Sequence, residues 1–391
     1  MKELNIGLFG FGTVGEGIYK VLNEKKQLGA TVKKICIKDP DKVRNAPDTL
    51  FTTQKDELLN DPEIDLIVEL IDDANAALEI IETSFRNGKS VISANKKVIA
   101  ENLVSLIELS KQHKVSFLYE AAVCASIPII RNLEEYFDND LLDSVNGIVN
   151  GSTNYILTKM QEDDKSYSDA LSEAQELGFA ESDPSLDVEG VDAAYKLSII
   201  TLHAFGKHIA AENIVRKGIS ALSQFDFQYA KEKNFAIKLI ALSKAGNDGT
   251  IEQLSVLPRF VEKSSALHNI NNEYNGLLLQ TALADEQFFY GKGAGRYPTS
   301  SAVLSDISAF KYDYQYAYKK GFDVTEKDNE LNYNVYISYK PDYALDPDIF
   351  EVIHEQYYNQ DRCYICGEIS YHELESNGLL EDKNYSLICF N

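Results

Sequence analysis

Positive charge and long apolar runs are what this sequence has least of. Its 391 residues carry 38 lysines and arginines against 61 aspartates and glutamates, a formal net charge of −23. That balance argues against nucleic acid or an anionic membrane surface as the main partner. No apolar run reaches the roughly 18 residues of a membrane span, and no secretory leader pattern precedes Ile6. We therefore expect a cytoplasmic protein with neither a nucleic-acid nor a membrane partner.

Cysteine is scarce as well. The five cysteines are odd in number and scattered along the chain, which favours a reducing compartment. Cys363 and Cys366 form one closely spaced pair, a spacing found in metal and redox sites. Residues three apart on a strand point to opposite faces, and no second pair accompanies these two. We therefore do not expect a metal ion there.

The length exceeds what one hydrophobic core usually serves, so two or three domains are expected. Hydrophobic residues at 44% and charged residues at 25% are ordinary for a globular protein. Beyond residue 127 the pattern mixes strands and helices, and beyond about residue 322 it becomes rich in tyrosine. The expected strands there are 145–150, 253–258, 276–283, 332–339 and 364–370, and the expected helices are 129–137, 155–160, 234–245, 299–307 and 347–358.

The N-terminus carries a glycine turn between a strand and a helix. Residues 4–9 form a short apolar strand, the sequence GFGTVG follows with Gly10, Gly12 and Gly15, and apolar residues then recur at helical spacing. This is the context that a dinucleotide-binding fingerprint needs, because the turn brings backbone amides and a helix N-terminus to the pyrophosphate. The alternative is a merely structural turn.

The residues after the second expected strand, 32–37, bear on the choice of cofactor. An acidic residue about 20 positions past the glycines normally binds the ribose 2′-hydroxyl, whereas a nearby cation admits a 2′-phosphate. Here Lys38 and Asp39 stand side by side, and Lys42 and Arg44 follow. The pattern favours NADP over NAD without deciding between them, and a charged surface turn is the other interpretation.

Strands and helices continue to alternate up to residue 120, with strands at 65–71, 89–93 and 115–120 and helices at 74–85 and 103–112. This alternation predicts an open parallel sheet that binds ligands beyond the carboxyl ends of its strands. Lys96 and Glu120 both follow such ends. A lysine at this position is more often a surface residue than a catalytic one.

In residues 178–200, GFAESDPSLDVEGVDAAYKLSII, four carboxylates fall within the nine residues 181–189, and a helix is expected to start directly after them. Asp192 and Lys196 are four residues apart and share one helix face. One interpretation is a solvent-facing salt bridge, which contributes little. The other is a lysine held by an aspartate at the mouth of an acidic pocket that receives a cationic ligand, such as a free amino acid.

Together these segments resemble the homoserine dehydrogenase family. The motifs that carry the resemblance are GFGTVGEGIY, SANKK, YEAAVCASIPII, NGSTNYIL, GFAESDPSLDVEGVDAAYKL and GKGAGRYPTSSAV, spread over residues 6–310. The resemblance implies NAD(P)H-dependent reduction of L-aspartate 4-semialdehyde to L-homoserine. It implies an α/β protein: a Rossmann-type dinucleotide-binding domain (1–130), an α+β catalytic and dimerisation domain (131–322) whose segment 293–312 packs back on the cofactor domain, and a degenerate ACT-like α+β module (323–391).

The resemblance also assigns roles to residues. Lys196 and Lys96 would be catalytic, with Asp192 as the partner of Lys196, and Glu181 and Asp187 would bind the substrate. The cofactor, NADP or NAD, would contact Gly10, Gly12, Thr13, Val14, Gly15, Lys38, Ser93, Lys96 and Gly293. Glu120, Val123 and Ala125 match a loop that binds sodium in some relatives. Two positions depart from the family pattern: Phe179 replaces a tyrosine, and Cys124-Ala-Ser126 replaces glycines of the cation loop.

Two other functions stay open from the residues alone. One is another NAD(P)-dependent dehydrogenase of amino or hydroxy acids, and the other is an amino-acid sensor without turnover. The expected partners are the small-molecule substrate and further copies of the chain, as a homodimer or homotetramer. The tail lacks the usual Asp-x-Pro-Gly opening of an ACT module. We therefore expect subunit association to be its main use, weak or absent inhibition by threonine, and intact chemistry without it.

Overall fold

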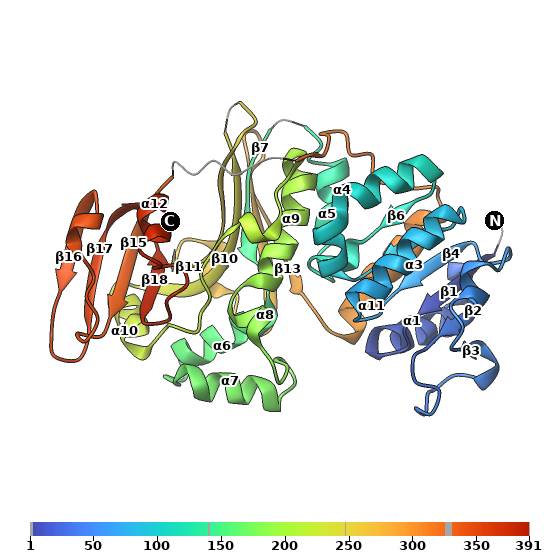
Figure 1. The fold of residues 1–391 in the computed structure, drawn as a ribbon, viewed down its shortest axis with the longest axis horizontal. Coiled ribbons are helices and arrows are strands. Elements are labelled where there is room, and N and C mark those ends of the chain that lie inside the picture. Colours follow the sequence, from blue (N-terminus) through green and yellow to red (C-terminus); the bar gives the residue numbers. More distant parts are fainter. Residues whose placement is uncertain (1–2, 140, 247, 325–330, 391) are drawn as a thin grey trace. The chain divides into compact units, whose positions relative to one another are not determined.

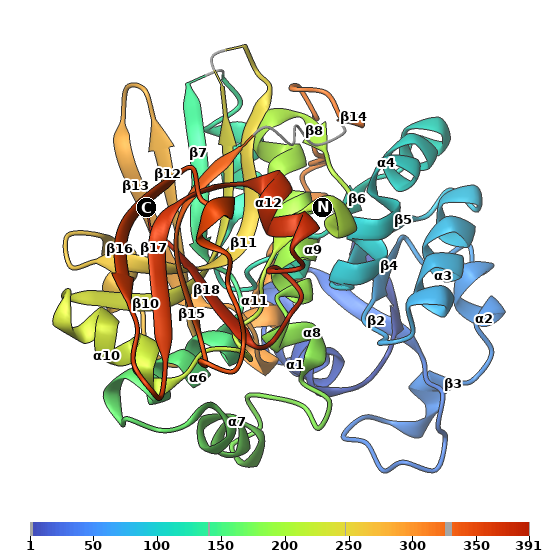
Figure 2. The ribbon, with the colours of Figure 1, turned by 60° about the vertical axis from the view of Figure 1, so that its left-hand side comes forward.

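The computed structural model describes residues 3–139, 141–246, 248–324 and 331–390. The chain divides into two compact units (Figures 1 and 2). Unit 1 comprises residues 1–138, 202–208 and 292–324, and unit 2 comprises residues 139–201, 209–291 and 325–391. Among the described residues, no helix is both long and apolar enough to cross a membrane.

Unit 1 is built on a six-stranded sheet in the order β3-β2-β1-β4-β5-β6, with every neighbouring pair parallel. The strands are β1 (Leu4–Phe9), β2 (Ala30–Cys36), β3 (Phe51–Thr52), β4 (Leu66–Glu69), β5 (Ser90–Ser93) and β6 (Phe117–Leu118). Strands β4 and β5 are buried along their whole length, as expected for central strands of a sheet covered on both faces. The predicted Rossmann-type parallel sheet is therefore confirmed.

The helices of unit 1 connect and cover these strands. They are α1 (Thr13–Glu24), α2 (Asp56–Leu59), α3 (Ala74–Arg86), α4 (Lys96–His113), α5 (Ile129–Glu135) and α11 (Arg296–Phe310). Helix α4 begins seven residues before the predicted start and has a kink at Asn102. Helix α11 packs on α1, since Ser300 Oγ donates to Val14 O (3.2 Å) and Arg296 pairs with Glu16 (3.1 Å).

Unit 2 contains a ten-stranded sheet in the order β13-β12-β7-β10-β11-β18-β15-β17-β16, with β9 paired to β11. Figure 2 shows the C-terminal strands, in orange and red, continuing the sheet from β10 and β11. The strands are β7 (Leu142–Ile148), β9 (Val215–Arg216), β10 (Phe235–Ala245), β11 (Ile251–Glu262), β12 (Tyr274–Thr281), β13 (Asp285–Lys292), β15 (Asn332–Tyr339), β16 (Val352–Tyr357), β17 (Cys363–Ser370) and β18 (Tyr385–Cys389).

Six helices accompany the sheet of unit 2 in the described residues. They are α6 (Gly151–Glu162), α7 (Tyr167–Glu176), α8 (Ser185–Val188), α9 (Val191–Phe205), α10 (Gln224–Glu232) and α12 (Tyr371–Ser376). Residues 191–201 of α9 belong to this unit. Thr201 Oγ1 donates to Ser243 Oγ on β10 (3.0 Å), so this face of α9 lies against the sheet.

Two predicted helices are wrong. Residues 234–245 form the central strand β10, bonded to β7 on one side and β11 on the other. A strand buried on both faces is apolar throughout, so its hydrophobic pattern does not separate it from a buried helix. Residues 347–358 form a short 3₁₀ turn, Pro347–Ile349, and then the edge strand β16, which pairs with β17.

The C-terminal strands share a hydrophobic core with the rest of unit 2. Val215 and Leu257 lie in one buried cluster with apolar residues of the tail, among them Val335, Ile365 and Leu387. Strand β18 also pairs in parallel with β11, where Cys389 faces Arg259. The tail and the preceding sheet are therefore continuous in both backbone pairing and core.

Candidate active site

The glycine turn between β1 and α1 leaves the first amides of α1 open. Gly10 has φ +92°, and a Cβ there would lie 2.8 Å from the carbonyl oxygen of Leu70, so glycine is required. A Cβ on Gly15 would meet Gly10 O at 2.4 Å, whereas one on Gly12 would meet nothing within 4 Å. Gly12 and Thr13 are exposed. An exposed N-terminus of a twelve-residue helix is an anion site of the kind that binds pyrophosphate.

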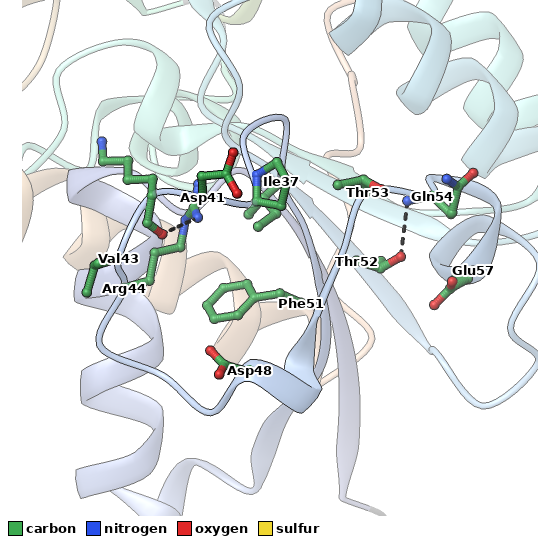
Figure 3. A pocket seen from close by; sticks show the side chains of 12 residues that line it. Ile37, Asp41, Val43, Arg44, Asp48, Phe51, Thr52, Thr53, Gln54 and Glu57 are labelled. Atoms are coloured by element: carbon green, nitrogen blue, oxygen red, sulfur yellow. Dashed lines mark hydrogen bonds between the residues drawn. The ribbon is translucent and has the colours of Figure 1, made fainter.

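A cavity of about 770 Å³ lies beyond the end of β2 (Figure 3). Its lining includes Lys42 and Arg44 from the loop after β2, and Phe51 from β3. The guanidinium of Arg44 lies over the ring of Phe51, 5.6 Å from its centroid, and Arg44 Nη1 donates to Lys42 O (2.6 Å). Lys38 is exposed and does not line this cavity. The cations that line the cavity are therefore Lys42 and Arg44, and not Lys38.

The ends of β4 and β5 carry a buried carboxyl group. Ser93 Oγ donates to Glu69 Oε2 (2.6 Å), and the Ile71 amide donates to Glu69 Oε1 (2.7 Å). Burial raises the pKa of Glu69 to about 7, and these hydrogen bonds only partly oppose the rise. Asn95 then caps α4 by accepting from Val98 N (3.2 Å). Lys96 is the first residue of that helix and is half-buried.

The predicted cation loop follows β6. Its Glu120 carboxylate accepts from the amides of Ile130 (2.8 Å) and Arg131 (3.0 Å) at the start of α5. The Glu120 amide donates to the buried Asp306 (3.0 Å). Burial raises the pKa of both carboxyl groups. Because the Glu120 carboxylate already accepts hydrogen bonds from α5, a cation at Val123 and Ala125 would have backbone carbonyl oxygens as its ligands. In the described residues no group of three acidic, histidine or cysteine side chains could hold a metal ion.

A second glycine-rich turn, residues 291–295 (GKGAG), lies against this loop. Ser126 Oγ donates to the carbonyl of Lys292 (2.9 Å), and the Ser126 amide contacts the same carbonyl (3.2 Å). Gly293 follows directly and is buried. The structure thus places Gly293 between β13 and α11.

In unit 2, Asp187, Asp192 and Lys196 lie close together. Lys196 Nζ is 2.8 Å from Asp192 Oδ2 and donates to Val149 O at 2.7 Å. Both members of the pair are buried, with side-chain exposures of 8% and 2%. The interpretation as a solvent-facing salt bridge is therefore wrong. A buried pair forms only where further hydrogen bonds satisfy it, and the Val149 carbonyl is one such partner.

Asn150 joins the two aspartates and is the residue that the sequence interpretation missed. Its Nδ2 donates to Asp187 Oδ1 (2.6 Å) and to Asp192 Oδ2 (2.8 Å). Its Oδ1 accepts from Thr153 N (2.9 Å), which caps α6. The available signal was the position of Asn150 after a strand and before Gly151, as expected of a helix N-cap.

Glu181 is placed differently from the other predicted substrate residues. It is exposed in the segment between α7 and α8, and its backbone carbonyl accepts from Gln175 Nε2 (2.9 Å). Phe179, where the family pattern has a tyrosine, packs its ring against Tyr155, with centroids 4.8 Å apart. Its carbonyl accepts from Ser152 Oγ (2.6 Å), so this segment is fastened to α6.

The parallel sheet and the glycine turn define the class as a dinucleotide-binding protein of the Rossmann type. Sequence comparison gives the family. The profile described as "Homoserine dehydrogenase, NAD binding domain" matches residues 10–120, and "Homoserine dehydrogenase" matches residues 128–308. The chain is 36% identical over 318 residues to homoserine dehydrogenase of Bacillus subtilis, covering 79% of this chain and 73% of that protein. The Synechocystis enzyme is 37% identical over 313 residues, covering 78% and 72%.

Solved structures agree over the whole length. A homoserine dehydrogenase from Thiobacillus denitrificans has a TM-score of 0.86 at 27% identity, covering 100% of this chain and 99% of that one. The Staphylococcus aureus enzyme at pH 6.5 has a TM-score of 0.77 at 29% identity, with the same coverage. The chain belongs to the homoserine dehydrogenase family. It is an NAD(P)-dependent oxidoreductase with homoserine dehydrogenase activity, in the biosynthesis of amino acids from aspartate.

Proposed function

We propose that Lys196 acts on the substrate oxygen during reduction of aspartate semialdehyde. When bound, the nicotinamide supplies the hydride, and negative charge develops on the former aldehyde oxygen. The buried ammonium of Lys196 can stabilise that charge and donate a proton to it. Two of its three N–H groups point to Val149 O and Asp192 Oδ2. These two contacts support a fixed orientation for the third N–H group, which we propose faces the substrate oxygen.

For the substrate's ammonium group we propose Asp187 and Glu181. Asp187 is half-buried and shares the Asn150 amide with Asp192, so its carboxylate is oriented before substrate binds. A site that places an oriented carboxylate for the ammonium discriminates against an aldehyde that lacks this group. Glu181 is exposed, and its proposed role rests on the family motif.

The experiment that tests the role of Lys196 is its replacement by alanine. We expect Lys196→Ala to lower kcat by about 10² or more, as loss of a proton-transfer group does, while NADPH affinity changes little. The matched control is Lys159→Ala, which breaks an exposed i,i+4 ion pair of 3.1 Å on α6. If Lys196→Ala turned over at a rate close to that of the control, the proposed role would be wrong.

Lys96 is proposed as the second lysine of the reaction and as a cofactor contact. Its place at the first turn of α4, directly after β5, is the end of a parallel strand at which ligands bind. Lys96→Ala should lower kcat as Lys196→Ala does. Lys97→Ala is the matched control, because Lys97 is exposed and lies 3.9 Å from Glu101. If only Lys97→Ala lowered kcat, the role would belong to Lys97 and not to Lys96.

We further propose NADPH as the preferred cofactor, with the 2′-phosphate bound in the cavity beyond β2. Lys42 and Arg44 line that cavity, and Lys38 adds a cation near the same strand end. A hyperthermophilic archaeal homoserine dehydrogenase mutant, with a TM-score of 0.68 at 27% identity over 81% of this chain and 100% of that one, was solved in complex with NADPH. Arg44→Ala should raise KM for NADPH about tenfold, the loss of one charged hydrogen bond, and leave KM for NADH unchanged. An equal rise for both cofactors would contradict the assignment.

A monovalent cation, sodium in particular, is proposed at the loop of Glu120, Val123 and Ala125, held by backbone carbonyl oxygens because the Glu120 carboxylate caps α5. Thermal unfolding in sodium chloride against choline chloride at equal ionic strength tests it. A higher Tm in sodium supports the site, and identical Tm values contradict it.

The proposed assembly is a homodimer or homotetramer, and the proposed compartment is the cytoplasm. The compartment is supported by the five cysteines, all of which are free thiols. Light scattering of the purified protein measures the assembly, and a monomer at micromolar concentration would contradict it. Cell fractionation measures the compartment, and recovery outside the cytoplasmic fraction would contradict it.

A further inference from the structure

The C-terminal segment 379–383, which we name the tail loop, reaches the substrate-binding part of unit 2. Lys383 Nζ lies 2.6 Å from Glu189 Oε1, and Ser220 Oγ donates to the same oxygen at 3.0 Å. Glu189 stands between α8 and α9, two residues after Asp187 and three before Asp192. One end of the tail loop therefore holds the junction between these two helices.

A second contact anchors the tail loop from inside. Lys217 is 4% exposed, and its Nζ donates to Leu379 O (2.9 Å) and Asp382 O (2.7 Å). Burial lowers the pKa of Lys217 to about 8, against the opposing carboxylates of Asp382 and Glu189. A buried ammonium is costly unless its protons are bonded. The tail loop supplies two of the acceptors that Lys217 needs.

The backbone of residues 218–219, which follows Lys217, packs tightly against the backbone of residues 188–189. Ile219 N donates to Val188 O at 2.8 Å. A Cβ on Gly218 would lie 2.5 Å from Val188 O and 2.7 Å from Glu189 Cα. Close packing of this kind transmits displacement instead of absorbing it. A shift of the tail loop would therefore move the junction between α8 and α9.

We propose that the tail loop, through Lys217 and Glu189, positions the helix junction that carries the substrate-binding carboxylate Asp187. Lys383 and Lys217 are positioning residues, because Lys383 joins the tail loop to the junction and Lys217 holds the tail loop beside it. The inference rests on the proposed role of Asp187 in substrate binding. It makes the tail part of the substrate-binding apparatus, so that whatever binds or displaces the tail loop changes substrate affinity.

We expect substitution of Lys217 to raise KM for homoserine more than substitution of Lys383. The Lys383–Glu189 pair is partly exposed, at 66% and 31%, and such pairs contribute little. Lys383→Ala and Glu189→Gln should each raise KM for homoserine about twofold to fivefold, with kcat and KM for the cofactor unchanged. The double variant should match the single ones, since both remove one interaction. Lys217→Gln should raise KM about tenfold or more, because it loses charged hydrogen bonds.

Lys233→Ala is the matched control. It removes another exposed ion pair to the C-terminal strands, 3.2 Å from Glu355 on β16, and should leave KM unchanged. Lys217→Arg keeps the charge and the donors and should restore most of the affinity. If Lys217→Gln does not fold, Lys383→Ala and Glu189→Gln still decide the matter. Unchanged KM in Lys383→Ala, in Glu189→Gln and in any folded Lys217→Gln, as in the control, overturns the proposal.

Asp187→Asn separates this inference from the proposed function on which it rests. A higher KM for homoserine in Asp187→Asn, together with a higher KM in the tail-loop variants, supports both. A higher KM in Asp187→Asn with unchanged values in the tail-loop variants overturns the positioning role alone. An unchanged KM in Asp187→Asn overturns the substrate role of Asp187 and the inference with it.

Discussion

Asn150 offers a sharp test of the substrate site, because its two polar atoms serve different purposes. Nδ2 donates to Asp187 at 2.6 Å and to Asp192 at 2.8 Å, whereas Oδ1 caps α6 by accepting from Thr153 N. Aspartate is as good an N-cap as asparagine. Asn150→Asp therefore keeps the helix cap and replaces the shared donor with a third carboxylate beside two others.

The expected loss follows from those bonds. A hydrogen bond to a charged group contributes about 1.5–3 kcal/mol, so the two together amount to about 3–6 kcal/mol, and the added negative charge raises the cost further. Part of this will be relieved by proton uptake among the three carboxyl groups. We expect kcat/KM for homoserine to fall by about 10²–10³, which corresponds to about 2.7–4 kcal/mol in the transition state.

Steady-state oxidation of homoserine, followed by NADPH absorbance, measures the effect. NADPH affinity should stay close to that of the unsubstituted protein, whereas Tm should fall, because the lost hydrogen bonds also stabilise the fold. Asn150→Ser serves as the control, since serine also caps helices and loses the shared donor without adding charge, and its loss should be smaller. The reasoning is refuted if folded Asn150→Asp retains kcat/KM within about threefold.

Three further predictions concern stability. The pKa of Glu69, about 7, lies above its ordinary 4.5, so the folded chain holds the proton more tightly, and unfolding free energy should fall by about 3 kcal/mol as pH rises between these values. Glu69→Gln should abolish that slope and stabilise the protein above pH 7 in urea titrations; an unchanged slope contradicts this. Buried Asp226 accepts hydrogen bonds from the hydroxyls of Tyr336, Ser338 and Ser386. Asp226→Ala should therefore lower the unfolding free energy by about 3–5 kcal/mol in the same titrations. A loss below about 1 kcal/mol would contradict this and show that the three hydroxyls find other partners. Removal of residues 325–391 would expose the core shared by Val215 and Leu257; we expect loss of cooperative unfolding by circular dichroism, whereas a folded, active fragment would restore the sequence-based expectation of an independent tail.

The parts of the fold that were predictable are those governed by local chemistry. A glycine turn must follow β1 because the backbone at Gly10 is left-handed, and the second glycine turn before α11 is equally local. Strands β15 and β17 were predicted within one residue of their bounds. Their β-branched and aromatic residues favour strands whatever their neighbours are.

The wrong predictions concern segments whose secondary structure depends on the strands that pair with them. Residues 234–245 are apolar enough for a buried helix, and only pairing with β7 and β11 makes them the strand β10. Residues 352–357 become the strand β16 because β17 offers an edge to pair with. Hydrophobic periodicity does not record which backbone lies alongside.

The sequence by itself determined the family and the spacing of Asp192 and Lys196 on one helix face, since a helix fixes which residues lie one turn apart. Tertiary structure alone decided that this pair is buried. The Val149 carbonyl and the Asn150 amide that satisfy it come from more than forty residues earlier. Lys383 meets Glu189 across 194 residues of sequence. Such partners meet only when the sheet of unit 2 has formed, and a buried polar group is stable only once they have met.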